Sequence, residues 1–230
     1  MTKNLFQRII TSIFLLFLLF IINFSNQFIF ILSILIVGLI VCIEASNIFL
    51  KLSKLEMSKK NYPFKKKINF MFITLNLITF FYIFFIFCNF SYEIYRFESP
   101  IFFFYIISIC FFTDIGGYVF GKSFGGAKLT KISPNKTISG TVGSFIFSII
   151  PIILFLNLGY LDLEINLNNI IFILLVSLIS QLGDLFISYL KRKAKIKDTG
   201  KILPGHGGIL DRIDGIIFAV PFSYLLLILI

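Results

Sequence analysis

The sequence predicts an all-α protein, a polytopic bundle of about seven transmembrane helices. Hydrophobic residues make up 58% of the 230 positions, phenylalanine alone occurs 32 times, and only 14% of the residues are charged. A water-soluble fold cannot bury that much apolar surface. The apolar runs recur from end to end, with no polar stretch long enough for a separate soluble unit. Residues 1–230 are therefore predicted to form a single membrane domain.

Each predicted span is an apolar run between charged clusters. A helix needs about 20 apolar residues to cross the hydrocarbon core of a bilayer. The runs that approach or meet this length are 9–22, 28–50, 68–88, 100–120, 141–158, 170–190 and 213–230. The first and last runs are short, and both are counted as spans.

The basic residues predict the orientation of these spans, because loops rich in Lys and Arg stay in the cytoplasm. With the N-terminus inside, segments 3–8, 51–67, 122–136 and 191–212 are cytoplasmic, and they hold every Lys and Arg except Arg96. We therefore expect a cytoplasmic N-terminus, a C-terminus outside, and a multi-pass location in the plasma (inner) membrane.

The formal net charge of +10 is spread over these juxtamembrane loops rather than over one soluble face. Such a distribution favours contact with anionic lipid in the bilayer and predicts no nucleic-acid partner. The three cysteines, Cys42, Cys88 and Cys110, lie in or beside apolar runs without metal-ligand spacing, so we expect them to pack rather than to react.

Acidic residues inside the spans point to a functional site, because a charge at membrane depth is costly. Glu44, Asp114 and Asp184 each lie seven or eight residues before the next basic residue. A rise of about 1.5 Å per residue then places each roughly 10 to 12 Å below the inner surface. For Glu44, pairing with a lysine or a backbone group near the helix end stands equally beside a functional role.

Asp184 belongs to a polar stripe. Gln181, Asp184, Ser188 and Lys191 follow one another at helical spacing on an otherwise apolar helix, so the stripe is predicted to face into the protein. It leads into segment 188–214, the most polar part of the chain. We expect this segment to lie in the cytoplasm and to carry the catalytic site.

The composition of this segment suits phosphate chemistry. Moving a nucleotidyl group requires cations beside phosphate oxygens, carboxylates for Mg²⁺, and a backbone that approaches the phosphates closely. Asp211 and Asp214 would share a helix face if the last helix begins near Ile209. The glycines just before it would leave backbone N–H groups free to bind an anion at that N-terminus.

Four groups of residues carry a resemblance to a known family: Ser188-x-x-Lys191-Arg192, Lys197-Asp198-x-Gly200, Leu203-Pro204-x-His206-Gly207-Gly208 and Asp211-Arg212-x-Asp214. They match every fixed position of the phosphatidate cytidylyltransferase signature, so the chain resembles that family. Three further stretches also look like the family: Gln181-Leu182-Gly183-Asp184, Asp114-x-Gly116-Gly117-Tyr118 and Ser133-Pro134-Asn135-Lys136-Thr137-x-x-Gly140. The last departs from the usual form at Asn135, Ile138 and Ser139, where the family commonly shows Lys, Trp and Glu.

The resemblance implies a nucleotidyltransferase of phospholipid biosynthesis. In its reaction, the phosphate of phosphatidic acid attacks the α-phosphorus of CTP, which yields CDP-diacylglycerol and pyrophosphate. The family also implies a homodimer, Mg²⁺ held by Asp184 and Asp211, and a second cation, for which K⁺ is a candidate.

The residue roles expected from the resemblance fall into two groups. Catalysis and direct phosphate contacts are expected from Ser188, Lys191, Arg192, Asp198, His206, Arg212 and Asp214. Nucleotide or cofactor contacts are expected from Lys136, Thr137, Lys197, Gly207 and Gly208. The only histidine, His206, is expected to donate or accept a hydrogen bond rather than to act as a base, since a phosphate monoester is already an anionic nucleophile.

Two other functions remain as alternatives. Another membrane enzyme that uses CTP, such as a polyprenol kinase, would share nucleotide binding but not the full signature, and a transporter would need no glycine-rich phosphate loop. Residues 116–123 also fit the expression of a phosphate-binding P-loop that ends in Lys122 and Ser123. That motif requires a buried strand before it, whereas a membrane helix is predicted here, so the match is interpreted as a coincidence.

Overall fold

Helices account for nearly all secondary structure in the computed structural model, which describes residues 3–57, 65–130, 133, 136–159, 161, 164–203 and 207–229, without the side chains of 3–10, 12, 13 and 65–68. Outside the helices, the described residues contain two isolated β-bridges, Lys128 with Thr137 and Leu203 with Gly207. The prediction of an all-α fold is confirmed.

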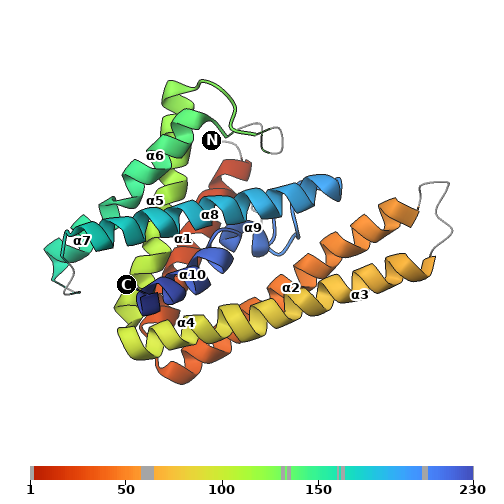
Figure 1. Ribbon diagram of the computed structural model, residues 1–230, viewed down its shortest axis with the longest axis horizontal. Helices are drawn as coiled ribbons and strands as arrows, with labels where there is room; N and C mark the ends of the chain where they lie inside the picture. Colours follow the sequence, from red (N-terminus) through yellow and green to blue (C-terminus); the bar gives the residue numbers. More distant parts are fainter. Residues whose placement is uncertain are drawn as a thin grey trace. The chain divides into compact units, whose positions relative to one another are not determined.

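The helices in chain order, shown in Figure 1, are α1 (Lys3–Asn23), α2 (Gln27–Met57), α3 (Lys65–Phe81), the π-helix η1 (Tyr82–Cys88), α4 (Asn89–Glu93), the π-helix η2 (Ile94–Glu98), α5 (Pro100–Phe124), α6 (Ile138–Ser148), α7 (Ile150–Leu158), α8 (Leu167–Lys193), α9 (Leu210–Ile213) and α10 (Ile216–Leu229).

Five helical stretches among the described residues are long and apolar enough to cross a membrane: Gln27–Met57, Asn69–Glu98, Pro100–Phe124, Ile138–Leu158 and Leu167–Lys193. Two shorter apolar stretches, Phe14–Asn23 and Ile216–Leu229, match the first and last predicted runs. The chain is thus a polytopic membrane protein.

The break between α6 and α7 was not predicted, and Pro151, near the start of α7, accounts for it because proline cannot donate a helical hydrogen bond.

Short polar side chains begin several of these helices. Asn26 accepts a hydrogen bond from the Ile29 N–H at the start of α2, and Ser99 accepts one from Phe102 N–H just before Pro100 of α5, both at 2.9 Å. Asn166 accepts one from Asn169 N–H, also at 2.9 Å, at the start of α8. Each cap satisfies a backbone donor that has no partner within its own helix.

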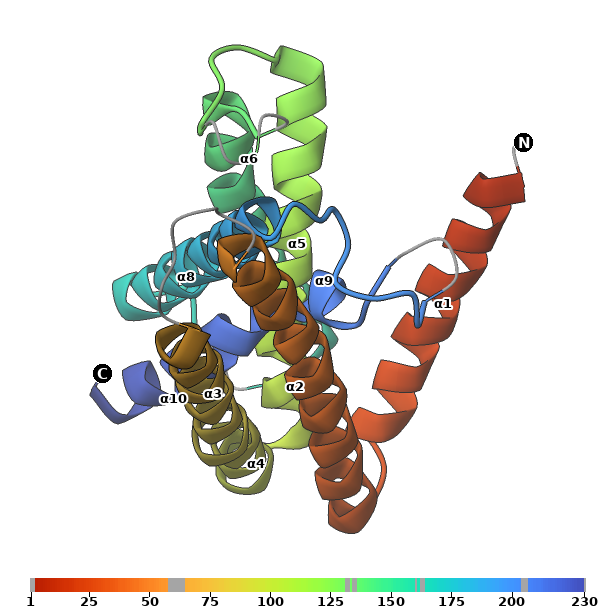
Figure 2. The same ribbon diagram turned by 90° about the vertical axis from the view of Figure 1, so that its right-hand side faces the viewer.

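Residue contacts divide the chain into two units, and each is described by itself. The first unit comprises Met1–Asn89 and Leu190–Ile213. In it, α2 and α3 run side by side (Figures 1 and 2). Gly38 lets α2 approach η1 closely, because a Cβ atom there would lie 3.0 Å from Ile83 and 3.1 Å from the Cys88 sulfur. Cys88 is buried in this contact, as a packing residue would be.

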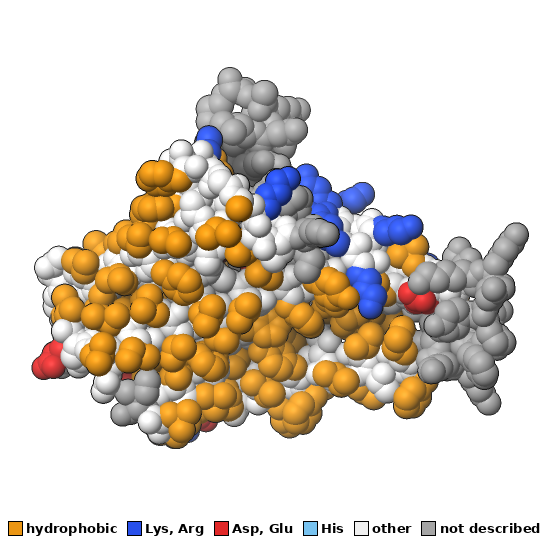
Figure 3. Space-filling view, turned by 45° about the horizontal axis from the view of Figure 1, so that its top comes forward, with side chains coloured by type: hydrophobic (Ala, Val, Ile, Leu, Met, Phe, Trp, Pro, Cys, Tyr) orange, Lys and Arg blue, Asp and Glu red, His pale blue; other side chains and the backbone are white. Residues whose placement is uncertain are grey.

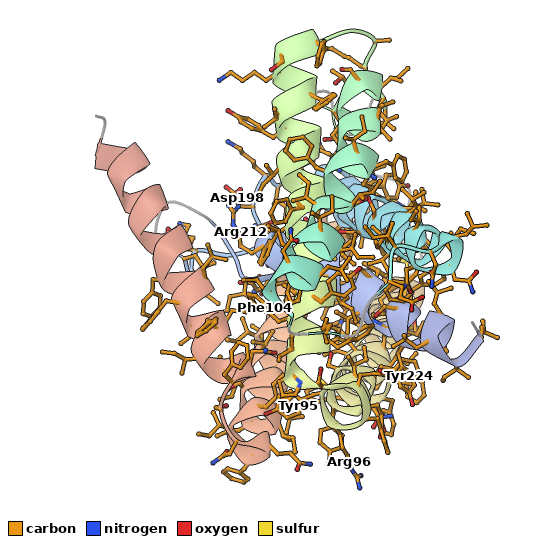
Figure 4. All side chains as sticks on the ribbon, turned by 90° about the vertical axis from the view of Figure 1, so that its left-hand side faces the viewer. Tyr95, Arg96, Phe104, Asp198, Arg212 and Tyr224 are labelled. Atoms are coloured by element: carbon orange, nitrogen blue, oxygen red, sulfur yellow. The ribbon has the colours of Figure 1, made fainter. Side chains whose placement is uncertain are left out.

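The second unit comprises Phe90–Tyr189 and Asp214–Ile230. Helices α5 and α6 lie side by side in it (Figures 1 and 4). Their glycines meet: a Cβ atom on Gly116 would collide with the backbone of Gly143, and one on Gly117 would lie 2.7 Å from Ser144 Oγ. Close backbone approach of this kind is common between membrane helices, where apolar side chains gain nothing over lipid.

Two more contacts place α8 within the second unit. The Thr113 hydroxyl of α5 donates a hydrogen bond of 2.9 Å to the Ser177 hydroxyl of α8. Gly183 of α8 admits the ring of Phe218 from α10, since a Cβ atom there would lie 2.6 Å from that ring. The helix that carries Asp184 is therefore fixed on two sides.

The surface bears many exposed apolar side chains, and Figure 3 shows them over much of the visible face. Arg96, the basic residue expected on the outer side, lies in η2, where its guanidinium stands 5.1 Å from the centre of the Phe97 ring (Figure 4). Such a surface suits lipid rather than water.

Candidate active site

The described residues of segment 188–214 make their densest polar contacts around Asp211. This cluster, called the Glu44–Asp211 cluster below, consists of Glu44, Lys191, Thr199 and Asp211, all in the first unit. Its members come from α2, the end of α8, the loop that follows, and α9. Residues distant in sequence thus meet around one buried carboxylate.

Asp211 uses both of its oxygens. Oδ1 accepts a hydrogen bond from Lys191 Nζ at 2.8 Å, which is also an ion pair. Oδ2 accepts hydrogen bonds from Thr199 N–H at 2.8 Å and from Gly208 N–H at 3.0 Å, and it lies 3.0 Å from the Thr199 hydroxyl, whose single proton it shares with Glu44.

These contacts govern the charge of Asp211. Burial raises the pKa of its carboxyl, but the hydrogen bonds from Lys191, Gly208 N–H and Thr199 N–H and the lysine charge outweigh burial, so the pKa falls below its ordinary value of 3.8. Asp211 is therefore an anion at neutral pH. Its stabilisation of the fold is present above the ordinary pKa and is lost as the pH falls through the lowered one.

Glu44 completes this cluster from α2. Its side chain is 2% exposed. Oε2 accepts hydrogen bonds from the Thr199 hydroxyl at 2.8 Å and Leu210 N–H at 2.9 Å, and Oε1 accepts one from Ile209 N–H at 3.1 Å. Glu44 thus pairs with backbone groups, as one of its two interpretations expected, but these groups belong to a distant segment and not to the end of its own helix.

The expectation of free N–H groups before the last helix is wrong in this structure. Gly207 N–H donates to Leu203 O, Gly208 N–H to Asp211, and the next two N–H groups to Glu44. The protein's own carboxylates fill the place where a bound anion was expected. The premise of one continuous last helix is also wrong, because a turn at Asp214 and Gly215 separates α9 from α10.

A second cluster lies in the second unit and is called the Asp184 cluster, consisting of Lys136, Asp184 and Ser188. The Lys136 ammonium forms a short ion pair with Asp184 Oδ2, and the Ser188 hydroxyl donates to Asp184 Oδ1 at 3.2 Å. Both charged side chains remain about a quarter exposed, at 29% for Lys136 and 25% for Asp184. Solvent and small ligands can therefore reach this pair.

The loop between α5 and α6 brings Lys136 to this position. Gly125 and Gly126 have φ values of 60° and 101°, which turn the chain sharply after α5. Leu129 N–H then donates to Lys136 O at 2.8 Å. Thr137 caps α6 by accepting a hydrogen bond from Gly140 N–H at 3.1 Å, so its hydroxyl has a local structural role in this structure.

The polar stripe of α8 lies as predicted. Lys191 is buried and Asp184 and Ser188 are partly buried, whereas Leu182, Phe186 and Tyr189 on other faces of the same helix are exposed. The prediction that the stripe points into the protein is confirmed.

The remaining predicted site residues are less enclosed. Arg192, Lys197, Asp198 and Arg212 are exposed, and Figure 4 shows Asp198 and Arg212 in the same region of the view. Asp214 Oδ1 accepts a hydrogen bond from Gly215 N–H at 3.0 Å. His206 lies outside the described residues. The roles of all these residues stay predictions.

The residues that match the P-loop expression form part of a helix. Residues 116–123 lie wholly inside α5, and their glycines face α6 rather than a ligand. Lys122 is exposed, with its ammonium 3.5 Å from the Tyr118 hydroxyl. The rejection of a P-loop is confirmed.

The donor set suits a hard divalent cation. Carboxylate oxygens are the ligands that Mg²⁺ prefers, and each unit by itself presents one such carboxylate, Asp211 in the first and Asp184 in the second. Within the part of the chain that the structure describes, no three acidic, histidine or cysteine side chains gather as a metal cluster. Each of the two carboxylates instead holds a lysine.

These helices and lysine–aspartate pairs define the class: a multi-pass membrane protein with charged side chains suited to phosphate and cation binding. The profile of the cytidylyltransferase family matches residues 47–230. The chain belongs to that family.

Individual relatives agree with this assignment. The chain is 44% identical over 127 residues to a protein of Staphylococcus haemolyticus named phosphatidate cytidylyltransferase, in a match covering 54% of this chain and 48% of the relative. It is 43% identical over 127 residues to the Bacillus subtilis protein of the same name, covering 55% and 47%. The chain thus spans about half the length of the curated relatives it matches.

Sequence reasoning missed one member of the Glu44–Asp211 cluster and left another undecided. Thr199 falls on a variable position of the signature, so the pattern gives it no weight. Glu44 precedes the family match, and its only signal was a carboxylate placed at membrane depth.

Proposed function

We propose that this chain transfers a cytidylyl group from CTP to phosphatidic acid, forming CDP-diacylglycerol and releasing pyrophosphate. The observation that carries the proposal is the pairing of each predicted cation ligand with a predicted phosphate ligand: Asp184 with Lys136, and Asp211 with Lys191. Membership of the cytidylyltransferase family and the names of the relatives support it.

The reaction makes one bond and breaks another. A phosphate oxygen of phosphatidic acid attacks the α-phosphorus of CTP, and the bond from that phosphorus to the β-phosphate oxygen breaks as pyrophosphate leaves. The attacking phosphate is already an anion, so the protein need not remove a proton from it. Its task is to position two anions and to neutralise their repulsion.

The lysines serve this task by changing partners. In this structure, Lys136 and Lys191 neutralise Asp184 and Asp211. When phosphates arrive, the two ammonium groups move to phosphate oxygens and the two carboxylates become available to a cation. The charge of each lysine and of each aspartate is thus compensated in both states, which limits the cost of burying these pairs.

Asp184 and Asp211 would hold Mg²⁺, with Asp214 in support, and the cation would neutralise charge on the triphosphate when bound. Ser188, which now donates to Asp184, would turn its hydroxyl to a phosphate oxygen. The exposed Arg192, Lys197 and Arg212 would bind the outer phosphates, and Asp198 would orient these basic groups. A second cation, with K⁺ as the candidate, a homodimer and a site on the cytoplasmic face of the plasma membrane complete the proposal.

Label transfer tests the reaction. Purified protein in detergent micelles, given phosphatidic acid and Mg²⁺, is expected to move label into lipid from α-labelled CTP but not from γ-labelled CTP. A lipid kinase would give the opposite result, since it transfers the γ-phosphate, and a transporter would leave the nucleotide intact. If no α-label reaches lipid while phosphatidic acid is supplied, the proposed reaction is wrong.

The orientation has its own test. A reporter inserted near Lys60, which lies outside the described residues, is expected inside the cell, and one fused after Ile230 is expected outside, because every Lys and Arg except Arg96 falls on one side. The measurement is the activity of a reporter that works in only one compartment. Finding both reporters on the same side would exclude the seven-span arrangement.

A further inference from the structure

We propose that Glu44 is a positioning residue that clasps the loop after α8 and thereby fixes Asp211 and Lys191 for the reaction. The inference rests on the proposed function for its catalytic consequence but not for the clasp itself. Glu44 lies before the residues that match the family profile, and it is buried on a different helix from every signature residue.

The clasp joins both ends of the loop. One carboxylate oxygen of Glu44 accepts from the Thr199 hydroxyl at 2.8 Å, near the start of the loop, and from Leu210 N–H at 2.9 Å, at its end. The other oxygen accepts from Ile209 N–H at 3.1 Å. A single side chain on α2 therefore holds two positions of the chain, Thr199 and Leu210, that are eleven residues apart in sequence.

Two signature glycines make room for this carboxylate. A Cβ atom on Gly200 would lie 2.5 Å from Glu44 Oε1, and one on Gly208 would collide with both Glu44 and the Thr199 hydroxyl. Neither glycine has a φ value in the left-handed region, so backbone conformation does not require glycine at either position. Space for Glu44 explains both glycines, of which the sequence alone assigned only Gly208 to ligand contact.

The clasp reaches Asp211 through shared donors. Thr199 gives its backbone N–H to Asp211 and places its hydroxyl between Glu44 Oε2 and Asp211 Oδ2, at 2.8 and 3.0 Å. Gly208 N–H donates to Asp211 next to the N–H groups that Glu44 holds. Releasing Glu44 would free these donors to move, and the Asp211 carboxylate with its Lys191 partner would move with them.

Glutamine cannot replace Glu44 in this arrangement. Each carboxylate oxygen accepts from a backbone N–H, so the amide nitrogen of a glutamine would face a backbone donor in either orientation. A buried donor without an acceptor is costly. Glu44→Gln changes one atom and almost no volume, and it is expected to open the loop while leaving the packing of α2 unchanged.

Trypsin reports the opening without any substrate, because Lys197 and Lys201 lie exposed within the loop. In detergent, Glu44→Gln is expected to raise the rate of cleavage after these lysines by about tenfold or more. Thr199→Val, a milder change to the same clasp, is expected to raise it in the same direction. The matched control is Glu164→Gln, which neutralises an exposed acid and should leave the cleavage rate at the wild-type value.

Kinetics then separate positioning from general destabilisation. A displacement of about 1 Å at reacting groups costs on the order of 10²-fold in rate, so Glu44→Gln is expected to lower kcat by about that factor with little change in the KM for phosphatidic acid. The double variant with Glu44→Gln and Thr199→Val should lower kcat by no more than the more damaging single substitution does, since both substitutions act through one contact.

The outcomes distinguish the two proposals. Unchanged cleavage in Glu44→Gln and Thr199→Val overturns the clasp, whatever the activity. If Glu44→Gln does not fold, the trypsin cleavage rate of Thr199→Val alone decides whether the clasp exists. Faster cleavage with full kcat overturns the positioning role. Wild-type protein that makes no CDP-diacylglycerol overturns the proposed reaction but leaves the cleavage test valid.

Discussion

Replacing Asp184 or Asp211 with asparagine is expected to abolish cytidylyl transfer, with kcat falling by about 10³-fold or more. Asparagine keeps the shape of the side chain but removes the charge that would hold a divalent cation. Such a cation contributes several kcal/mol of charge stabilisation in the transition state, and each 1.36 kcal/mol is about tenfold in rate. The measurement is kcat for each variant at limiting and at saturating Mg²⁺.

The two variants should differ in stability, which separates loss of chemistry from loss of fold. The Lys191 and Asp211 side chains are only 11% and 7% exposed, so Asp211→Asn leaves a buried ammonium without its counter-charge and should lower the melting temperature. The Asp184 pair is more exposed, and Asp184→Asn should melt close to the wild type. Near-normal activity of either variant at limiting Mg²⁺ would remove that residue from the cation site.

Lys191→Ala is expected to lower kcat by about 10²- to 10³-fold, whereas Lys122→Ala should cost less than about tenfold. Lys191 is buried beside Asp211, in the cluster proposed to bind phosphate, and lies on the same helix as Asp184. Losing a preorganised contact of this kind costs about 3 to 4 kcal/mol of transition-state stabilisation. Lys122 is exposed at the end of α5 and can act only through surface electrostatics, which salt screens.

The decisive measurement for these lysines is kcat at saturating CTP and phosphatidic acid in detergent micelles, repeated at raised ionic strength. The deficit of Lys122→Ala should shrink with salt, and that of Lys191→Ala should persist. A larger loss in Lys122→Ala than in Lys191→Ala would show that residues 116–123 bind the nucleotide and that the active site has been placed wrongly.

Most of the helical architecture could be predicted because few backbone conformations are possible for an apolar run in a membrane. Backbone groups in lipid must pair within their own segment, so each run folds as a helix. The breaks were harder to foresee. At the turn that separates α9 from α10, Gly215 packs against Ser180, whose hydroxyl would lie 2.5 Å from a Cβ atom at that position. Such a contact between distant residues has no local signal.

The site could be predicted only in part for a related reason. Lys191 stood out as the end of the polar stripe on α8, and Asp211 as part of the family signature. The N–H groups of Ile209 and Leu210 are occupied by Glu44, which belongs to a helix far earlier in the chain. A pattern within one segment predicts the residue types that the chemistry needs but not which neighbour holds them in place.

The glycine contact between α5 and α6 has a consequence for the membrane in which the protein works. Gly116 and Gly143 bring two backbones together with the Phe120 and Phe147 side chains packed against them, and lipid tails cannot enter such a contact. The pair should therefore stay closed when the bilayer changes thickness or fluidity. The loop that carries Lys136 is anchored to the ends of these two helices. Lys136 would thus keep its position at the ends of these two helices in bilayers of different lipid composition.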